Sequence, residues 1–216
     1  MNNEKKVFNL RKKIFKCKKY NKYNEILYNL FIQMYYDYKS CIPVCFSNLD
    51  YDKINIFKQK EYLDIYNKVL NDISIVNKQK LNKNVLFIIH PFYPLLRHSN
   101  FLIQSDYYLK QYIAYEKKIT KILKFSKRDI VLVDSPDSFM NYTYKFLKYR
   151  RIKRVLLTRH SEGFLLNKDD IDLLKNVENA SLIGCYKNRC ISDFESEISL
   201  INYKKIDSLI FSRFEE

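Results

Sequence analysis

The triplet Arg-His-Ser occurs twice in this chain, at 97–99 and 159–161, and each time it follows a short apolar run. His90, the third of the three histidines, ends the apolar run NVLFIIH. Arginine grips phosphates and carboxylates through forked hydrogen bonds, and histidine transfers protons near neutral pH. The recurrence of both residue types after apolar runs therefore indicates a site for an anionic ligand.

The ends of the apolar runs and the segments that follow them hold every histidine, both glycines and three of the four prolines of the chain. Turns need glycine and proline for their own geometry, but they have no such need of histidine or arginine, so the clustering favours a functional site. Two histidines and two acids are the catalytic candidates: His98, His160, Asp134 and Glu162. The ligand-binding candidates are His90, Arg97, Arg159, Ser161, Gly163, Gly184, Tyr186 and Arg189.

The elements that must position these residues follow from periodicity. Four apolar runs, NVLFIIH, DIVLVDSP, RVLLTRH and ASLIGCY, have the length and composition of buried strands, and the segment 206–214 is a candidate fifth strand. Helical patterns over 105–125, 137–152, 169–177 and 189–201 alternate with the runs. This alternation predicts an α/β fold with a mostly parallel, three-layer, Rossmann-like sheet, in which ligands bind at the carboxyl ends of the strands.

The chain divides into three predicted parts: residues 1–23, 24–83 and 84–216, the last being the α/β domain. Residues 24–83 read as a helical region packed on the core, with helices over 25–39 and 58–76 and a short edge strand over 41–48. Residues 1–23 carry nine lysines or arginines against one acidic residue. This segment is either a basic arm whose aromatic side chains stack on bases, or a helix with an apolar stripe.

The formal net charge of +15 favours a polyanionic partner such as nucleic acid. The scarcity of glycine and the abundance of lysine, asparagine, isoleucine and tyrosine also fit an AT-rich coding sequence, which would raise the lysine content without any such partner.

No apolar run is long enough to span a bilayer, and the N-terminus lacks the features of a secretory signal. We therefore expect a cytoplasmic protein without membrane contact, and with its odd number of five cysteines reduced.

Glycine-rich phosphate loops and dinucleotide fingerprints are absent from the sequence. The cysteine pairs Cys41–Cys45 and Cys185–Cys190 have spacings that zinc sites rarely use, although zinc binding and a catalytic Cys185 remain alternatives. We expect neither cofactor nor metal.

Two motifs resemble known families. LTRHSEG is similar to the Arg-His-Gly-Glu signature of histidine phosphatases, which would make His160 the nucleophile and Arg159 the phosphate clamp, but Ser161 replaces the glycine. GCYKNRCI resembles the cysteine loop of isochorismatase-like hydrolases, in which an aspartate would stand at the position of His90. The remaining catalytic parts of both families are missing, so the sequence is assigned to no family.

Three functions follow from the sequence. The first is an α/β domain that binds an anionic ligand, phosphate-bearing molecules included, at the carboxyl edge of the sheet, with hydrolysis or group transfer as its reaction class. The second is a non-catalytic protein that binds nucleic acid through the basic, aromatic N-terminal region. The third is an interaction or structural protein without a ligand. The expected partner is accordingly an anionic small molecule or nucleic acid.

Overall fold

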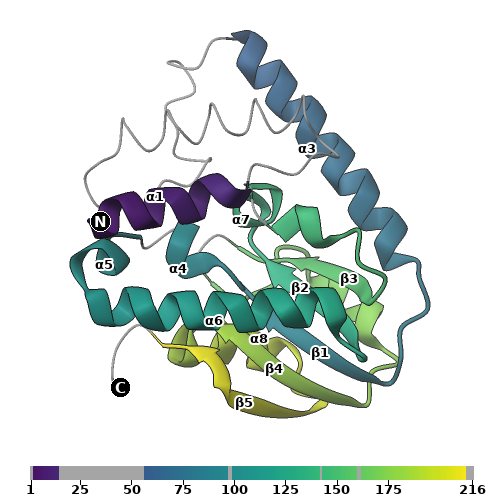
Figure 1. The fold of residues 1–216 in the computed structure, drawn as a ribbon. Coiled ribbons are helices and arrows are strands. Elements are labelled where there is room, and N and C mark those ends of the chain that lie inside the picture. The colour runs from purple at the N-terminus through teal and green to yellow at the C-terminus, as the bar shows by residue number, and fades with distance from the viewer. Residues whose placement is uncertain (1, 15–55, 97–98, 142, 160–161, 213–216) are drawn as a thin grey trace.

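A five-stranded parallel sheet forms the centre of the computed structural model, which describes residues 2–14, 56–96, 99–141, 143–159 and 162–212 (Figure 1). The strands are β1 (Asn84–Ile89), β2 (Asp129–Asp134), β3 (Ile152–Leu157), β4 (Asn179–Cys185) and β5 (Asn202–Phe211). Their order across the sheet is β3-β2-β1-β4-β5, and all neighbouring pairs run parallel. The predicted fold, a parallel three-layer α/β sheet, is confirmed.

Helices cover both faces of this sheet, and Figure 1 shows α6 and α8 on opposite sides. The first outer layer consists of α1 (Asn3–Ile14), α3 (Ile56–Asn77), α4 (Tyr93–Leu96), α5 (Ser99–Gln104), α6 (Asp106–Phe125), α7 (Pro136–Asn141) and the 3-10 turn η4 (Thr143–Phe146). The second consists of the 3-10 segment η5 (Lys168–Leu174), the turn η6 (Lys187–Ile191) and α8 (Ser192–Glu197). Alternate residues of β1 enter the two cores, Leu86 and Ile88 the first, Val85 and Phe87 the second.

The helix α6 connects β1 to β2 and agrees with the sequence prediction at its start. The Oγ atom of Ser105 accepts a hydrogen bond from the Tyr108 N–H, as an N-cap residue does. One face of the helix is buried against the sheet, and its buried residues are Leu109, Tyr112, Tyr115, Ile119 and Leu123. Since the crossover returns to the start of β2, α6 runs from the carboxyl edge of the sheet to its amino edge.

The two lateral edges of the sheet are protected differently. At β3, the side chain of Asn77 in α3 accepts from the Val155 N–H (2.7 Å) and donates to the Val155 carbonyl (3.0 Å). These two bonds satisfy backbone groups that would otherwise be open to another strand. At β5, the exposed Lys204 and Lys205 interrupt the strand with charge, a common protection against edge-to-edge association.

The predictions for the first part of the chain are tested only in places. Residues 3–14 form α1, whose Val7 is fully buried, so this segment is a helix packed on the core. The predicted helix over 58–76 is α3. The predicted helix over 25–39 and the strand over 41–48 lie outside the described residues, so the boundary at residue 24 stays a prediction. Among the described residues, every helix is too short or too polar to cross a membrane.

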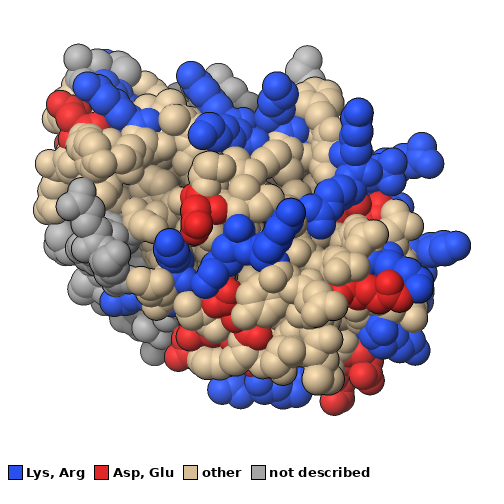
Figure 2. All heavy atoms as spheres, turned by 90° about the horizontal axis from the view of Figure 1, so that it is seen from below, with Lys and Arg blue, Asp and Glu red and all other residues tan. Residues whose placement is uncertain are grey.

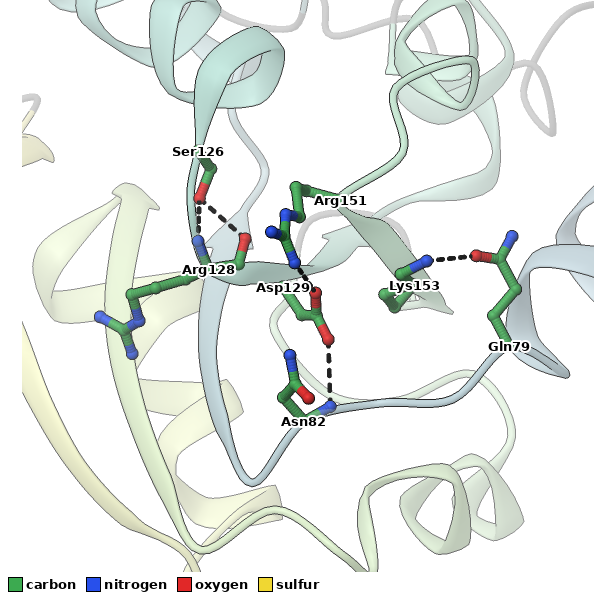
Figure 3. A network of polar contacts seen from close by, with 7 residues as sticks. All are labelled: Gln79, Asn82, Ser126, Arg128, Asp129, Arg151 and Lys153. Atoms are coloured by element: carbon green, nitrogen blue, oxygen red, sulfur yellow. Dashed lines mark hydrogen bonds and ion pairs between the residues drawn. The ribbon is translucent and has the colours of Figure 1, made fainter.

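The amino edge of the sheet is held by a buried carboxylate, shown in Figure 3. Asp129, 2% exposed, begins β2 and accepts hydrogen bonds from the Asn82 N–H (3.1 Å) and from the Arg151 guanidinium (3.3 Å). Lys153 donates to the side chain of Gln79 (2.6 Å) beside it. These contacts attach the connector between α3 and β1 to the first residues of β2 and β3, so the basic residues there have a structural role.

Replacing Asp129 by alanine tests this role. We expect Asp129→Ala to lower the free energy of unfolding by about 1–3 kcal/mol, because it leaves the Asn82 N–H and the Arg151 guanidinium without the buried carboxylate that accepts from them. The exposed Asp172 in η5 is the control, and Asp172→Ala should change the stability by less than about 0.5 kcal/mol. Urea unfolding of both variants measures the difference, and equal effects would contradict the role of Asp129.

Candidate functional site

At the carboxyl edge of the sheet, the apolar residues of each of the first three strands are followed by a buried polar residue. His90 follows β1, Asp134 ends β2 and Thr158 follows β3, and each side chain is at most 1% exposed. Ser135, Ser138 and Thr143, on the segment that follows β2, are buried beside them. We call these six residues the polar cluster: His90, Asp134, Ser135, Ser138, Thr143 and Thr158.

The backbone conformation of His90 directs its ring across the sheet. Its φ angle is +43°, in the left-handed region that side chains other than that of glycine adopt rarely, although histidine is among those found there. Its N–H donates to the Val133 carbonyl at 2.7 Å, and its Nε2 atom lies 2.8 Å from Thr158 Oγ1. Because β2 lies between β1 and β3, this contact links two strand ends across a third.

The carboxylate of Asp134 anchors the segment that follows β2. One oxygen accepts from the Ser135 N–H at 3.0 Å, and the other accepts from the hydroxyl of Thr143 at 2.5 Å. The Thr158 N–H donates to the Asp134 carbonyl at 3.0 Å, which ties the segment to the end of β3. Four residues of the polar cluster, His90, Asp134, Thr143 and Thr158, are therefore connected in one network.

Two hydroxyls of the cluster stand apart from this network. Ser135 is fully buried and Ser138 is 3% exposed, and no described residue forms a hydrogen bond with the Oγ atom of either serine. Burying a hydroxyl without a partner costs free energy, and most buried hydroxyls in folded proteins are paired. Both serines come from the short segment 135–138, so two hydroxyl donors without a partner among the described residues are near one another in the sequence.

The other half of the carboxyl edge, over β4 and β5, is aromatic. Tyr186 follows β4, is 4% exposed and lies against Tyr93 and Phe211, with ring centroids 6.2 and 6.4 Å apart respectively. Tyr93 also stacks on His90 at 4.8 Å, so the aromatic half adjoins the polar cluster at β1. Tyr186 thus has a packing role here, in addition to its predicted role in ligand binding.

Both predicted glycines are required by close backbone contacts. Gly184 has φ +129°, and a Cβ atom there would lie 1.9 Å from the Ile89 carbonyl oxygen. A Cβ atom on Gly163 would lie 1.8 Å from the Cys190 carbonyl oxygen, and the Gly163 N–H donates to Asp193 at 3.0 Å. The loop after β3 therefore packs on the segment after β4, which brings together two of the loops that the sequence placed at the site.

The charged candidates lie on the exposed side of these loops. Arg159, Glu162 and Arg189 are exposed. The Arg159 N–H donates to the Phe164 carbonyl (2.9 Å) and the Glu162 N–H to the Arg159 carbonyl (3.2 Å), so the backbone on both sides of the turn is fixed. Four candidates, Arg97, His98, His160 and Ser161, lie outside the described residues, and their roles stay predictions.

The two described cysteines have the properties of core residues. Cys185 is fully buried and its Sγ lies 3.2 Å from the hydroxyl of Tyr115, and burial raises the pKa of both groups well above their usual values. Burial also raises the pKa of Cys190 to about 11. Both thiols are therefore protonated near neutral pH, whereas a nucleophilic cysteine needs a lowered pKa. Within the described ranges, no three His, Cys, Asp or Glu side chains are placed to hold a metal ion.

Sequence reasoning missed Ser135, Ser138, Thr143 and Thr158 as site residues. Thr158 could have been found from the sequence, because it is the first polar residue after the apolar residues of its strand, as His90 and Asp134 are in theirs. Thr143 and Ser138 had none, since their burial depends on how α7 and η4 fold back onto the end of β2.

Comparison with known proteins found no matching family model, no matching curated protein and no matching solved structure.

Substitution of Ser138 tests whether its hydroxyl stabilises the fold or is available to a ligand. We expect Ser138→Ala to leave the free energy of unfolding unchanged or to raise it by about 1 kcal/mol, because the folded protein no longer buries an unpaired hydroxyl. Thr143→Val, which removes a donor from the buried Asp134 carboxylate, should lower it by about 1–3 kcal/mol. Chemical denaturation measures both, and a loss of stability in Ser138→Ala as large as that in Thr143→Val would show that Ser138 serves the fold.

Proposed function

We propose that the polar cluster and the exposed loop after β3 bind a small anionic ligand, and that the ligand carries a phosphate group. The observation that supports this proposal is the pair of buried hydroxyls of Ser135 and Ser138, for which no described residue is a hydrogen-bond partner. Hydroxyl donors suit a phosphate group, which has several acceptor oxygens. The site also lies at the carboxyl ends of parallel strands, where ligands bind in open α/β sheets.

The charges of the neighbouring groups suggest an orientation for the ligand. The Asp134 carboxylate is held in the network at the end of β2, whereas Arg159 is exposed on the loop after β3. An anion would therefore lie toward β3, within reach of the Arg159 guanidinium and away from Asp134. Arginine is well suited to this contact because its planar fork matches the oxygens of a phosphate.

The strand order supports a nucleotide as the ligand class. The order β3-β2-β1-β4-β5 is that of the first five strands in Rossmann-like nucleotide-binding sheets. Such domains hold the phosphate in a glycine-rich turn after β1, but here His90 and Pro91 follow β1 and the sequence of this turn contains no glycine. We therefore place the phosphate at the ends of β2 and β3 instead.

Hydrolysis or group transfer is the reaction class that we propose for this ligand. The polar cluster contains a histidine and a carboxylate, the side chains that most often transfer protons in enzymes. His90 and Asp134 lie at the ends of neighbouring strands. Thr158 connects them, because its hydroxyl contacts the His90 ring and its N–H donates to the Asp134 carbonyl.

Thermal shifts on the full chain test the binding proposal. Inorganic phosphate or a nucleoside monophosphate at about a hundred times its dissociation constant should raise the melting temperature by about 5–10 °C. Arg159→Gln should remove most of this shift, because it removes the cation at the rim of the site. Arg150→Gln, which changes an exposed arginine near the amino edge, should retain the shift. The same shift in both variants, or none with either ligand, would contradict the proposal.

A further inference from the structure

The exposed face of α6 carries a row of lysines that the proposed ligand site does not use. Five lysines of the helix are exposed: Lys110, Lys117, Lys118, Lys121 and Lys124. Within the described part of the chain, none of them forms an ion pair or a hydrogen bond with another side chain. From Lys110 to Lys124 the helix rises about 20 Å. Lys127, also exposed, extends the row past the end of the helix.

The charge of α6 is not shared by the other long helix. The sequence of α6 holds five lysines and two acids, Asp106 and Glu116, whereas that of α3 holds three lysines and three acids. Both helices come from the same chain, so an AT-rich coding sequence affects both alike and does not explain the difference. A helix face that only needs solvation would also carry both signs of charge, as α3 does.

Other parts of the molecular surface are basic as well. Figure 2 shows the lower face of the molecule in Figure 1, which a band of lysines and arginines crosses, with most of the acidic residues in the lower half of the view. Not every cation near the amino edge is available to a partner. Lys83 pairs with Glu178 at 2.5 Å, and Arg128 donates to Ser181 at 2.9 Å. The α6 lysines differ from these two cations, because no described residue pairs with them.

Aromatic side chains lie beside these lysines. Phe125, directly after Lys124, is 73% exposed, and Tyr107 at the other end of α6 is 57% exposed. Exposed aromatic rings next to lysines are the features by which proteins hold single-stranded nucleic acid, because the cations contact phosphates and the rings stack on unpaired bases. A membrane fits less well, since the apolar face of α6 is buried against the sheet and cannot insert.

We infer that the exposed face of α6 binds single-stranded nucleic acid, with Lys117, Lys121 and Lys124 contacting phosphates and Phe125 stacking on a base. This surface differs from the N-terminal segment 1–23 that the sequence suggested for the same class of partner. It is also independent of the ligand site, because these lysines lie in the half of α6 that approaches the amino edge of the sheet, and the polar cluster lies at the carboxyl edge.

A triple substitution tests the phosphate contacts. The full chain with Lys117→Gln, Lys121→Gln and Lys124→Gln should bind a labelled oligonucleotide of about 16 nucleotides roughly tenfold more weakly than the unchanged protein. The slope of log affinity against log salt should become shallower by about 2, since three phosphate contacts are lost. The control carries Lys78→Gln, Lys148→Gln and Lys175→Gln, which remove the same charge from exposed positions elsewhere. It should keep the affinity within about twofold.

Phe125→Leu tests the stacking contact. It should weaken binding to the single strand by roughly fivefold or more, and leave binding to the matching duplex unchanged, because paired bases are not free to stack on the ring. DNA and RNA versions of the oligonucleotide show whether the sugar matters. All substituted residues are exposed, so melting temperatures should not change, and this is checked first.

Three results would overturn the inference. Equal loss of affinity in the two triple variants would mean that net charge alone attracts the oligonucleotide. An unchanged protein that fails to bind the single strand even at low salt would show that the surface does not bind nucleic acid. The third result concerns vesicles of phosphatidylserine and phosphatidylcholine. If the unchanged protein binds these vesicles but not the oligonucleotide, and the α6 triple variant does not bind the vesicles, the surface binds membranes instead.

Discussion

Burial of the parallel strands on both faces is the constraint on which the rest of the structure depends. Every residue of β2 is buried, so the polar side chains of the sheet must find partners inside the protein or in a ligand. At the amino edge, Asp129 finds them in Asn82 and Arg151. At the carboxyl edge, His90, Asp134, Thr143 and Thr158 pair with one another, but Ser135 and Ser138 do not join them. The two edges thus obey the same physical rule, and among the described residues two hydroxyl donors are left without a partner at the carboxyl edge.

Much of the fold could be predicted because its strands are short apolar runs and α6 has a strong periodicity. The start of α6 at Ser105 and the burial of its apolar face both agree with the sequence. The second outer layer was harder to predict. The segment 169–177 reads as a helix, but only its first part is helical, as the 3-10 segment η5, with Leu174 as its buried side chain. The segment after β4 likewise departs from a regular helix, because η6 contains a kink at Asn188 and Arg189.

The sequence could place the candidate site at the carboxyl edge of the sheet, but it could not indicate most of the residues of the polar cluster. The position after each strand was sufficient to indicate His90 and Asp134. Gly163 and Gly184 fell in the same loops for reasons of backbone packing, which a sequence does not distinguish from ligand contact. Ser138 and Thr143 depend on a chain reversal after β2. The lysine face of α6 was visible in the sequence only as net charge, because identifying it requires knowing which side of the helix is exposed.

The central proposal is that the carboxyl edge of the sheet is a binding site. Hydrogen–deuterium exchange in the presence of inorganic phosphate tests this proposal without any substitution. Exchange should slow in peptides that cover 134–143 and 158–166, because a bound ligand stabilises the segments that contact it. Peptides from α6 and from the amino edge should be unchanged. Slower exchange confined to α6, or no difference anywhere at millimolar phosphate, would contradict the claim.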